Sequence, residues 1–202
     1  MGICYIVGAG DFFGDFSPKK EDLVIAADGG YGSLAKKNIR CDLLLGDMDS
    51  LKDTPKGIET LKFKVEKDET DMRLAYLEGV KRGYTDFALY GGVGGRADHT
   101  FANYCLLAEM AENSHTGTLY DEKCKAFAIK NNSTRVVGKA NKTVSVFAFG
   151  GDALGVDIKG LYYELTDGTL SSQNPLGVSN HITDSEGEVS VKNGTLLIMQ
   201  EI

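Results

Sequence analysis

The first half of the chain alternates two kinds of segment, and this alternation restricts the fold more than any other feature. Up to about residue 122, short apolar runs alternate with stretches whose apolar residues recur every three or four positions. The pattern is typical of a parallel sheet flanked by helices, because parallel strands need long crossover connections. The strands that we expect are Ile3–Val7, Leu23–Ala27, Asp42–Leu45, Thr60–Val65, Phe87–Tyr90 and Thr118–Tyr120, and the expected helices are Tyr31–Asn38, Thr70–Arg82 and Asp98–Glu112.

After about residue 123 the pattern changes to short alternating segments separated by Asn, Gly, Asp and Pro turn signals. This change predicts an antiparallel β-rich fold. We therefore expect an α/β fold class: an N-terminal open, mostly parallel sheet with flanking helices over residues 1–122, followed by a small C-terminal antiparallel β-sandwich over residues 123–202. Examples of the strands expected there are Thr134–Val137, Thr143–Phe149, Gly160–Leu165, Glu188–Val191 and Thr195–Met199.

The charge balance and the cysteines restrict the partners and the compartment. Acidic residues outnumber Lys and Arg by 29 to 22, which gives a formal charge of −7 and argues against nucleic acid or a membrane surface as partner. The four cysteines have no paired spacing, so we expect buried, free thiols. The chain begins without a basic segment followed by a long apolar run, and we expect a cytoplasmic protein.

Acidic residues follow the expected strands of the first half. Asp28 comes directly after the run Leu23–Ala27, and Asp47 and Asp49 come directly after the next apolar run. The carboxyl ends of parallel strands meet at one edge of an open sheet, where ligands bind. Two further groups occupy expected strand-to-helix turns: Lys67-Asp68-Glu69-Thr70-Asp71, and Gly91-Gly92-Val93-Gly94-Gly95-Arg96-Ala97-Asp98-His99.

Such a group of carboxylates needs a cation or bound protons. Two carboxylates ~4 Å apart repel by ~4 kcal/mol at an effective dielectric of ~20. Mg²⁺ prefers oxygen ligands and commonly binds one or two carboxylates together with substrate phosphates. With the glycine-rich loop and Arg96, whose forked guanidinium suits phosphate oxygens, the pattern indicates a metal and polyphosphate site.

Each acidic group also has a simpler interpretation. Asp68 or Thr70 could cap the helix that begins near residue 70, and Asp98 could cap the next helix. Asp28, with two glycines after it, could belong to an ordinary turn at the end of a strand. The Asp47-x-Asp49 pair is harder to explain structurally, because two acids flank one residue directly after an apolar strand.

Two other enzyme classes match parts of the pattern. Residues 92–97 fit a weak dinucleotide fingerprint, Gly-x-Gly-x-x-Ala, with Asp121 available for a ribose, but the loop follows the fifth expected strand instead of the first. Asp47-x-Asp49 also resembles the first motif of haloacid-dehalogenase phosphatases. Their late acidic motif would correspond to the region near Asp157, which falls in the β-rich half.

Taken in order, the motifs resemble those of the thiamine pyrophosphokinase family across nearly the whole chain. They are Ala-Asp-Gly-Gly, Gly-Asp-Met-Asp-Ser, Lys-Asp-Glu-Thr-Asp and Gly-Gly-Arg-Ala-Asp-His, followed by Gly-Leu-Tyr-Tyr-Glu-Leu and Gly-Val-Ser-Asn at residues 160–165 and 177–180. The resemblance implies diphosphate transfer from ATP to thiamine, which gives thiamine diphosphate and AMP, with Mg²⁺ as cofactor. It also implies an ATP-binding domain at residues 1–122, a thiamine-binding domain at residues 123–202, and a homodimer whose active site uses both subunits.

The resemblance also implies roles for individual residues. Asp71 is our candidate for the acid closest to catalysis, either holding metal or accepting the thiamine hydroxyl proton. The implied catalytic and metal-site acids are Asp47, Asp49 and Asp71; the ATP-site residues are Asp28, Asp68, Thr70, Arg96, Asp98 and His99; and the thiamine-site residues are Tyr163, Ser179 and Asn180.

Two positions depart from the family pattern. Some members have Trp where Tyr163 stands, and many have an acid where His181 stands. A tyrosine ring can still attract a cation, so stacking on thiamine remains the expectation at residue 163. The alternative from a different class is a non-catalytic nucleotide or metal sensor on the same fold.

Overall fold

The computed structural model describes residues 2–47, 57–63 and 68–202, and the chain divides into two compact units. The first unit comprises residues up to 103 together with residues 119–122, and the second comprises residues 104–118 together with residues 123–202. The first unit ends at residue 122 but excludes residues 104–118, so the domain bounds 1–122 and 123–202 stay a prediction. Each unit is described on its own.

The first unit contains a parallel sheet with the strand order β5-β1-β2-β3-β4. Every neighbouring pair in this order is parallel. All residues of β2 are buried, as expected for a strand covered on both faces. The bounds are β1 Cys4–Val7, β2 Leu23–Ala27, β3 Leu43–Gly46, β4 Glu59–Lys62 and β5 Asp86–Tyr90.

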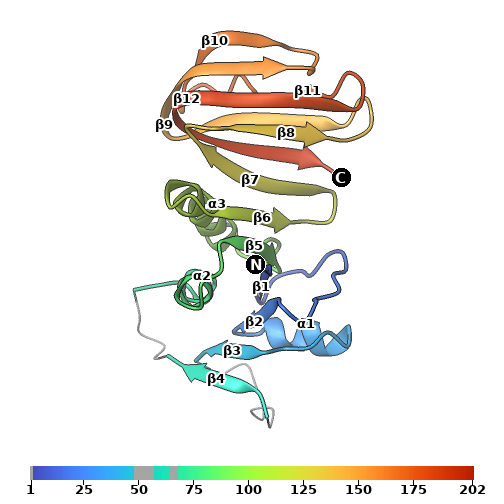
Figure 1. Cartoon of the computed structure of the whole chain (residues 1–202), viewed down its shortest axis with the longest axis vertical. Helices are drawn as coiled ribbons and strands as arrows, with labels where there is room; N and C mark the ends of the chain where they lie inside the picture. The colour runs from blue at the N-terminus through green and yellow to red at the C-terminus, as the bar shows by residue number, and fades with distance from the viewer. Residues whose placement is uncertain (1, 48–56, 64–67) are drawn as a thin grey trace. The chain divides into compact units, whose positions relative to one another are not determined.

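Helices α1 (Gly30–Lys36) and α2 (Asp71–Lys81) lie on opposite sides of these strands (Figure 1). The crossovers explain this arrangement, because β2 to β3 and β4 to β5 run in opposite directions across the sheet and right-handed crossovers then cover opposite faces. Helix α3 spans Ala97–Glu112. The structure confirms all three expected helices, with ends that differ by at most two residues.

The strand order places a switch point between β1 and β5. From β1 the chain builds the sheet through β2, β3 and β4 on one side, and β5 then adds on the other side of β1. In open α/β sheets the crevice at such a point, beyond the carboxyl ends of the strands, is where ligands bind. The loops that follow β1 and β5, residues 8–11 and 91–96, therefore flank the position at which a ligand is expected.

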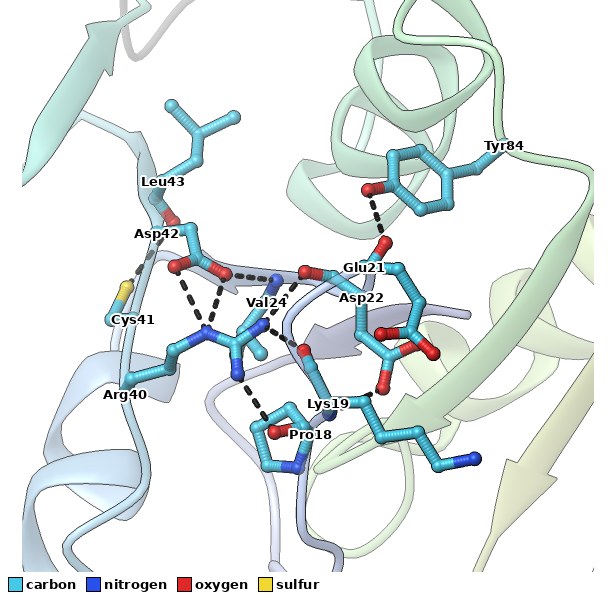
Figure 2. A network of polar contacts seen from close by, with 10 residues as sticks. All are labelled: Pro18, Lys19, Glu21, Asp22, Val24, Arg40, Cys41, Asp42, Leu43 and Tyr84. Atoms are coloured by element: carbon cyan, nitrogen blue, oxygen red, sulfur yellow. Dashed lines mark hydrogen bonds and ion pairs between the residues drawn. The ribbon is translucent and has the colours of Figure 1, made fainter. Parts of the chain in front are cut away.

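At the opposite, amino edge of this sheet, polar side chains bind one another and the backbone (Figure 2). Arg40 donates from its two terminal nitrogens to the carbonyls of Pro18 (2.8 Å), Lys19 (2.7 Å) and Asp22 (2.7 Å), and from Nε to Asp42 (3.1 Å). The Asp42 carboxylate also accepts the N–H of residue 24 at 2.9 Å. This network ties the starts of β2 and β3 to the segment before β2.

The second unit is an antiparallel β structure built on two long strands, β9 (Thr143–Lys159) and β12 (Glu186–Glu201). They pair along most of their length; β12 also pairs with β7 and β8, and β9 with β10 and β11. A separate apolar core of buried Val, Ile and Leu side chains fills this unit. The remaining bounds are β6 Thr116–Tyr120, which contributes residues to both units, β7 Cys124–Lys130, β8 Ser133–Val137, β10 Leu165–Leu170 and β11 Asn180–His181.

The predicted fold class is confirmed, but two strand predictions in the second unit are wrong. The expected strand Gly160–Leu165 is a connection, because β9 continues to Lys159 and Gly160 then turns the chain with φ +69°. A Cβ at that glycine would lie 2.7 Å from the carbonyl oxygen of residue 186. The strands expected at 188–191 and 195–199 are one strand, β12, with an irregularity at Gly194 (φ 122°).

The cysteines are free, as expected, but they differ in burial. Cys4 is buried, Cys41 and Cys124 are half-buried, and Cys105 is exposed, so the expectation of buried thiols fails for Cys105. Within the described ranges, no helix combines the length and the apolar character needed to cross a membrane.

Candidate active site

A pocket of about 280 Å³ opens at the carboxyl edge of the sheet in the first unit. It is lined by the loops after β1, β2 and β5 and by the first residues of α2 and α3. The volume is close to the lower end of the range typical of small-molecule sites, which is ~300 to ~1,000 Å³. The polar side chains that line it are Asp28, Thr70, Asp71, Arg96, His99 and Asn103.

Two glycine loops form one side of this pocket, and their backbones contact each other directly. The N–H of Gly10 donates to the carbonyl of Gly91 at 2.9 Å, and the N–H of Asp11 donates to the carbonyl of Val93 at 3.1 Å. A Cβ at Gly10 would lie only 2.4 Å from the Val93 oxygen. Glycine is therefore required for this approach, and it leaves backbone instead of side chain facing a ligand.

Asp28 enters the pocket from the end of β2 in a left-handed conformation, φ 49°. Its N–H donates to the carbonyl of Leu45, the residue before Gly46 at the end of β3, at 2.7 Å. Gly46 has φ 151°, and a Cβ there would lie 3.1 Å from the Cα of Asp28. The position of the Asp28 carboxylate therefore depends on Gly46, and a non-glycine residue held at positive φ is the kind of strain found at functional sites.

The turn before α2 supplies Thr70 and Asp71. The Thr70 hydroxyl accepts the N–H of Arg73 at 3.3 Å and so caps α2, which confirms the simpler interpretation for this residue although it also lines the pocket. Asp71 is the first residue of the helix, where the positive end of the helix dipole favours a carboxylate. Asp68 is exposed and does not line the pocket.

Arg96 lines the pocket and forms an ion pair with Asp98, which does not line it. The guanidinium donates to both carboxylate oxygens, at 2.5 and 3.1 Å. This hydrogen bonding raises the pKa of Arg96 and lowers the pKa of Asp98. Both side chains are exposed, and Asp98, the second residue of α3, also accepts the N–H of His99 at 3.0 Å.

The expected metal-site acids are only partly described. Asp47 directly follows β3 and does not line the pocket, and Asp49 lies outside the described residues. In the described ranges there is no cluster of three or more His, Cys, Asp or Glu able to hold a metal ion. Mg²⁺ that binds together with phosphates needs one or two carboxylates, so Asp28 and Asp71 are a donor set of the right chemistry.

The expected thiamine-site residues lie in the second unit, where Asn180 has a structural role that the sequence does not reveal. Asn180 is 3% exposed, and its carboxamide oxygen accepts the N–H groups of Tyr163 and His181, both at 2.9 Å. Its amide nitrogen donates to the carbonyl of Tyr163 at 2.8 Å. The carboxamide therefore holds the turn that carries Tyr163. The preceding Ser179 has φ 59°, and its N–H donates to the hydroxyl of Ser145 at 3.1 Å.

Tyr163 is 64% exposed and belongs to a group of three rings in the second unit. Its ring packs edge-on against Tyr162, with centroids 4.9 Å apart, and Tyr162 stacks on His181 at 4.7 Å. His181 therefore supports the aromatic group through Tyr162. An exposed tyrosine held by its neighbours offers a flat surface to a ring-shaped ligand.

The sequence interpretation missed two residues of the pocket, Met72 and Asn103. Asn103 could have been found, because it is a polar residue on the apolar face of α3 formed with Leu106, Leu107 and Met110. A buried polar residue among apolar ones usually makes a specific hydrogen bond, and the amide nitrogen of Asn103 donates to the carbonyl of Gly92.

Two family models match this chain. The model described as "Thiamin pyrophosphokinase, catalytic domain" matches residues 17–119. The model described as "Thiamin pyrophosphokinase, vitamin B1 binding domain" matches residues 129–196. The first match contains the described acidic motifs and the glycine loop after β5, and the second contains Tyr163, Ser179 and Asn180.

Individual proteins are similar as well. The thiamine pyrophosphokinase of Bacillus subtilis (strain 168) is 25% identical over 139 residues, which is 68% of this chain and 65% of that protein, slightly less than two thirds of its length. Among solved structures, a thiamine pyrophosphokinase from Bacillus subtilis has a TM-score of 0.89 at 22% identity and covers 98% of both chains. A thiamin pyrophosphokinase from Geobacillus thermodenitrificans has a TM-score of 0.87 at 25% identity, covering 99% of this chain and 97% of the other.

Proposed function

Since this chain belongs to the thiamin pyrophosphokinase family and is an enzyme of that family, we propose that it transfers a diphosphate group from ATP to the hydroxyl of thiamine in an Mg²⁺-dependent reaction. The products are thiamine diphosphate and AMP. The thiamine hydroxyl oxygen forms a bond to the β-phosphorus of ATP, the bond from that phosphorus to the oxygen shared with the α-phosphate breaks, and the hydroxyl proton is released.

One observation carries the proposal: a single pocket brings together acidic and basic side chains from loops that are distant in the sequence. Asp28, Asp71 and Arg96 line it together with two glycine loops whose backbones are open to a ligand. Carboxylates, a guanidinium and glycine backbone are the groups that bind a metal–polyphosphate complex.

Asp71 acts closest to the chemistry in this proposal. Its carboxylate lies at the first position of α2, beside the capping residue Thr70. From there it accepts the proton of the thiamine hydroxyl or binds the metal ion. In phosphoryl transfer the protein itself need form no covalent bond to the substrate. Most of the rate acceleration therefore comes from placing the hydroxyl in line with the β-phosphorus and from balancing the phosphate charge.

Arg96 and its neighbours bind the phosphates of ATP. The Arg96–Asp98 pair is exposed, and such a pair contributes about 0–1 kcal/mol, so the guanidinium exchanges Asp98 for phosphate oxygens at small cost. His99, the residue after Asp98 in α3, lines the same pocket. We assign Arg96, Asp98, His99, Asp28, Asp68 and Thr70 to ATP binding.

Mg²⁺ would neutralise phosphate charge and polarise the transferred group. Asp71 would hold the Mg²⁺ ion together with Asp47 and Asp49, which follow strand β3 in the sequence. Asp28 offers a further carboxylate in the pocket.

In the second unit we assign Tyr163, Ser179 and Asn180 to thiamine. The exposed ring of Tyr163 would lie against the ligand, while Asn180 holds the tyrosine in place and has one amide hydrogen beyond the bond to the Tyr163 carbonyl. Ser179 would hydrogen-bond the aminopyrimidine. We also propose a homodimer in which both subunits complete the active site, and a cytoplasmic location; light scattering of the purified protein tests the dimer.

The test is the reaction itself. The protein is incubated with ATP, Mg²⁺ and thiamine, and nucleotides and thiamine esters are separated by chromatography. We expect AMP and thiamine diphosphate to form in equal amounts, and chelation of Mg²⁺ with EDTA to stop both. ADP or free phosphate as the sole product would refute the proposal. Magnesium-dependent ATP binding with no turnover over hours in the presence of thiamine would instead identify a non-catalytic sensor.

A further inference from the structure

Asn103 is a buried polar residue of the pocket that the proposed mechanism does not use. It lies on α3, is 4% exposed, and lines the pocket together with Arg96 and His99 from the same region of the chain. Its amide nitrogen donates to the carbonyl of Gly92 at 2.7 Å. Because the buried amide of Asn103 donates to the carbonyl of a loop residue, this hydrogen bond fixes the loop more than it stabilises the helix α3.

The contact completes a set of three consecutive carbonyls that are all held. The carbonyls of Gly91 and Val93 accept the N–H groups of Gly10 and Asp11 from the loop after β1, and the carbonyl of Gly92 between them accepts from Asn103. Because a trans peptide is planar, its N–H points opposite to its carbonyl. Holding these carbonyls therefore also fixes the directions of the N–H groups of residues 92, 93 and 94.

These N–H groups are the part of the loop that a ligand can use. In the part of the chain that the structure describes, the N–H groups of Gly92, Gly94 and Gly95 donate to no backbone carbonyl. Gly94 and Gly95 have φ values of 76° and 75°, and the loop leads directly into the N-terminus of α3. Consecutive N–H groups in such left-handed turns form anion-binding concavities.

Asn103 and Gly92 also pack directly on each other. A Cβ at Gly92 would lie 2.9 Å from the amide nitrogen of Asn103 and 2.7 Å from Leu119. The loop has therefore no room to move toward the helix, and the hydrogen bond prevents the Gly92 peptide from rotating away. Glycine loops lose much conformational freedom when they bind a ligand, and a loop held in advance avoids part of this cost.

We propose that Asn103 is a positioning residue for the nucleotide: by holding the Gly92 carbonyl it fixes the peptide between residues 92 and 93, and together with the Gly10 and Asp11 contacts it keeps the glycine loop in the conformation that receives the phosphates of ATP, and so sets the affinity for ATP and not for thiamine. The inference rests on the proposed function, since that function supplies the triphosphate. It predicts a split between the two substrates that a general loss of stability would not produce.

The experiment measures nucleotide binding apart from turnover. The probe is α,β-methylene-ATP with Mg²⁺, in which the bond that would break is replaced, and binding is followed by isothermal titration calorimetry. Replacing Asn103 by Leu (Asn103→Leu) keeps a similar volume and removes the donor. We expect the Kd for the probe and the KM for ATP to rise about tenfold, the effect of one lost hydrogen bond, with the KM for thiamine changed less than about twofold. Asn113→Leu, at the exposed end of the same helical region, is the matched control and should leave both unchanged.

A second variant tests the contact between Asn103 and Gly92 by changing the glycine. In Gly92→Ala the added methyl displaces Asn103, so it should also weaken probe binding, and the double variant should lose less than the sum of the two single effects. If Asn103→Leu does not fold, Asn103→Ala and Gly92→Ala provide the same measurement. Unchanged probe affinity in the folded variants, or equal losses for ATP and thiamine, would overturn the inference.

Failure of the inference and failure of the proposed function give different results. If the wild-type protein binds the probe but forms no thiamine diphosphate, the proposed function fails while the binding comparison still tests Asn103. If the wild type forms the product and Asn103→Leu binds the probe as well as the wild type, only the inference fails. A wild-type protein that does not bind the probe contradicts both.

Discussion

The two edges of the parallel sheet in the first unit use the same kinds of side chain for opposite purposes. At the amino edge, Arg40 donates to Asp42 and to three backbone carbonyls, so its guanidinium is used by the fold (Figure 2). At the carboxyl edge, Arg96 pairs with Asp98 on the surface and faces a pocket. The difference indicates that residue type alone does not identify a binding site. What matters is whether the structure has already satisfied the donors and acceptors.

The largest expected effect is loss of turnover at the carboxyl edge. In Asp71→Asn we expect kcat to fall by about 10²- to 10⁴-fold, because a positioned acid or base contributes on that scale, while the thermal unfolding midpoint changes little. Turnover is measured by AMP release and folding by circular dichroism. The control is Asp15→Asn, whose carboxylate is 84% exposed and pairs with Lys37; it should retain wild-type turnover. Near-normal turnover of Asp71→Asn would refute the assigned role.

The next effect belongs to the amino edge and changes stability instead of turnover. Arg40→Met should lower the free energy of unfolding by about 2 kcal/mol, because it removes the charged donor from three backbone carbonyls, one of which, that of Asp22, is partly buried. Arg40→Lys should lose less, since it keeps the charge but not the forked geometry. Urea unfolding measures both. The kcat of the folded Arg40→Met protein should equal that of the wild type, and a large fall in kcat at unchanged stability would reverse our comparison of the two edges.

A smaller effect is expected where a glycine positions an acid of the pocket. Gly46→Ala places a methyl 3.1 Å from the Cα of Asp28 at a φ of 151°, so we expect kcat/KM for ATP to fall about tenfold as the carboxylate shifts. Gly32→Ala is the matched control, because nothing lies within 4 Å of its added methyl and alanine favours the helix. Equal activity of the two variants would show that Asp28 does not depend on Gly46.

The smallest effect concerns the thiol beside the amino-edge network. Burial raises the pKa of Cys41 to about 11, and its Sγ donates to the carbonyl of Leu43 at 3.3 Å. A raised thiol pKa means that the neutral form dominates at pH 8, so labelling by iodoacetamide should be slow and should accelerate about tenfold per pH unit until pH approaches 11. Cys105 is exposed and should be labelled first, as peptide mass spectrometry would detect. Fast labelling of Cys41 at pH 8 would show that this edge opens readily.

Much of the first unit could be predicted because its signals are local. Apolar runs and helical periodicity identified the sheet and the helices. The rule that carboxyl ends of parallel strands share an edge was applied to Asp28, Asp47 and Asp49; Asp28 lines the pocket with Asp71 and Arg96 from the strand-to-helix turns, whereas Asp47 does not line it. The second unit was predicted less well. Its long strands β9 and β12 continue through glycines that look like breaks in the sequence, because pairing with neighbouring strands carries them past those positions.

The amino-acid sequence by itself determined the fold class, the order of the helices and strands in the first unit, and the acidic and basic residues from which the site is drawn. Only the tertiary structure decided how each polar group is used: Thr70 caps α2, Asn180 holds the turn of Tyr163, and Asn103 holds the carbonyl of Gly92. The physical reason is one of range. Secondary structure follows from residues a few positions apart, whereas a hydrogen-bond partner is fixed by the distance between segments that meet only after folding.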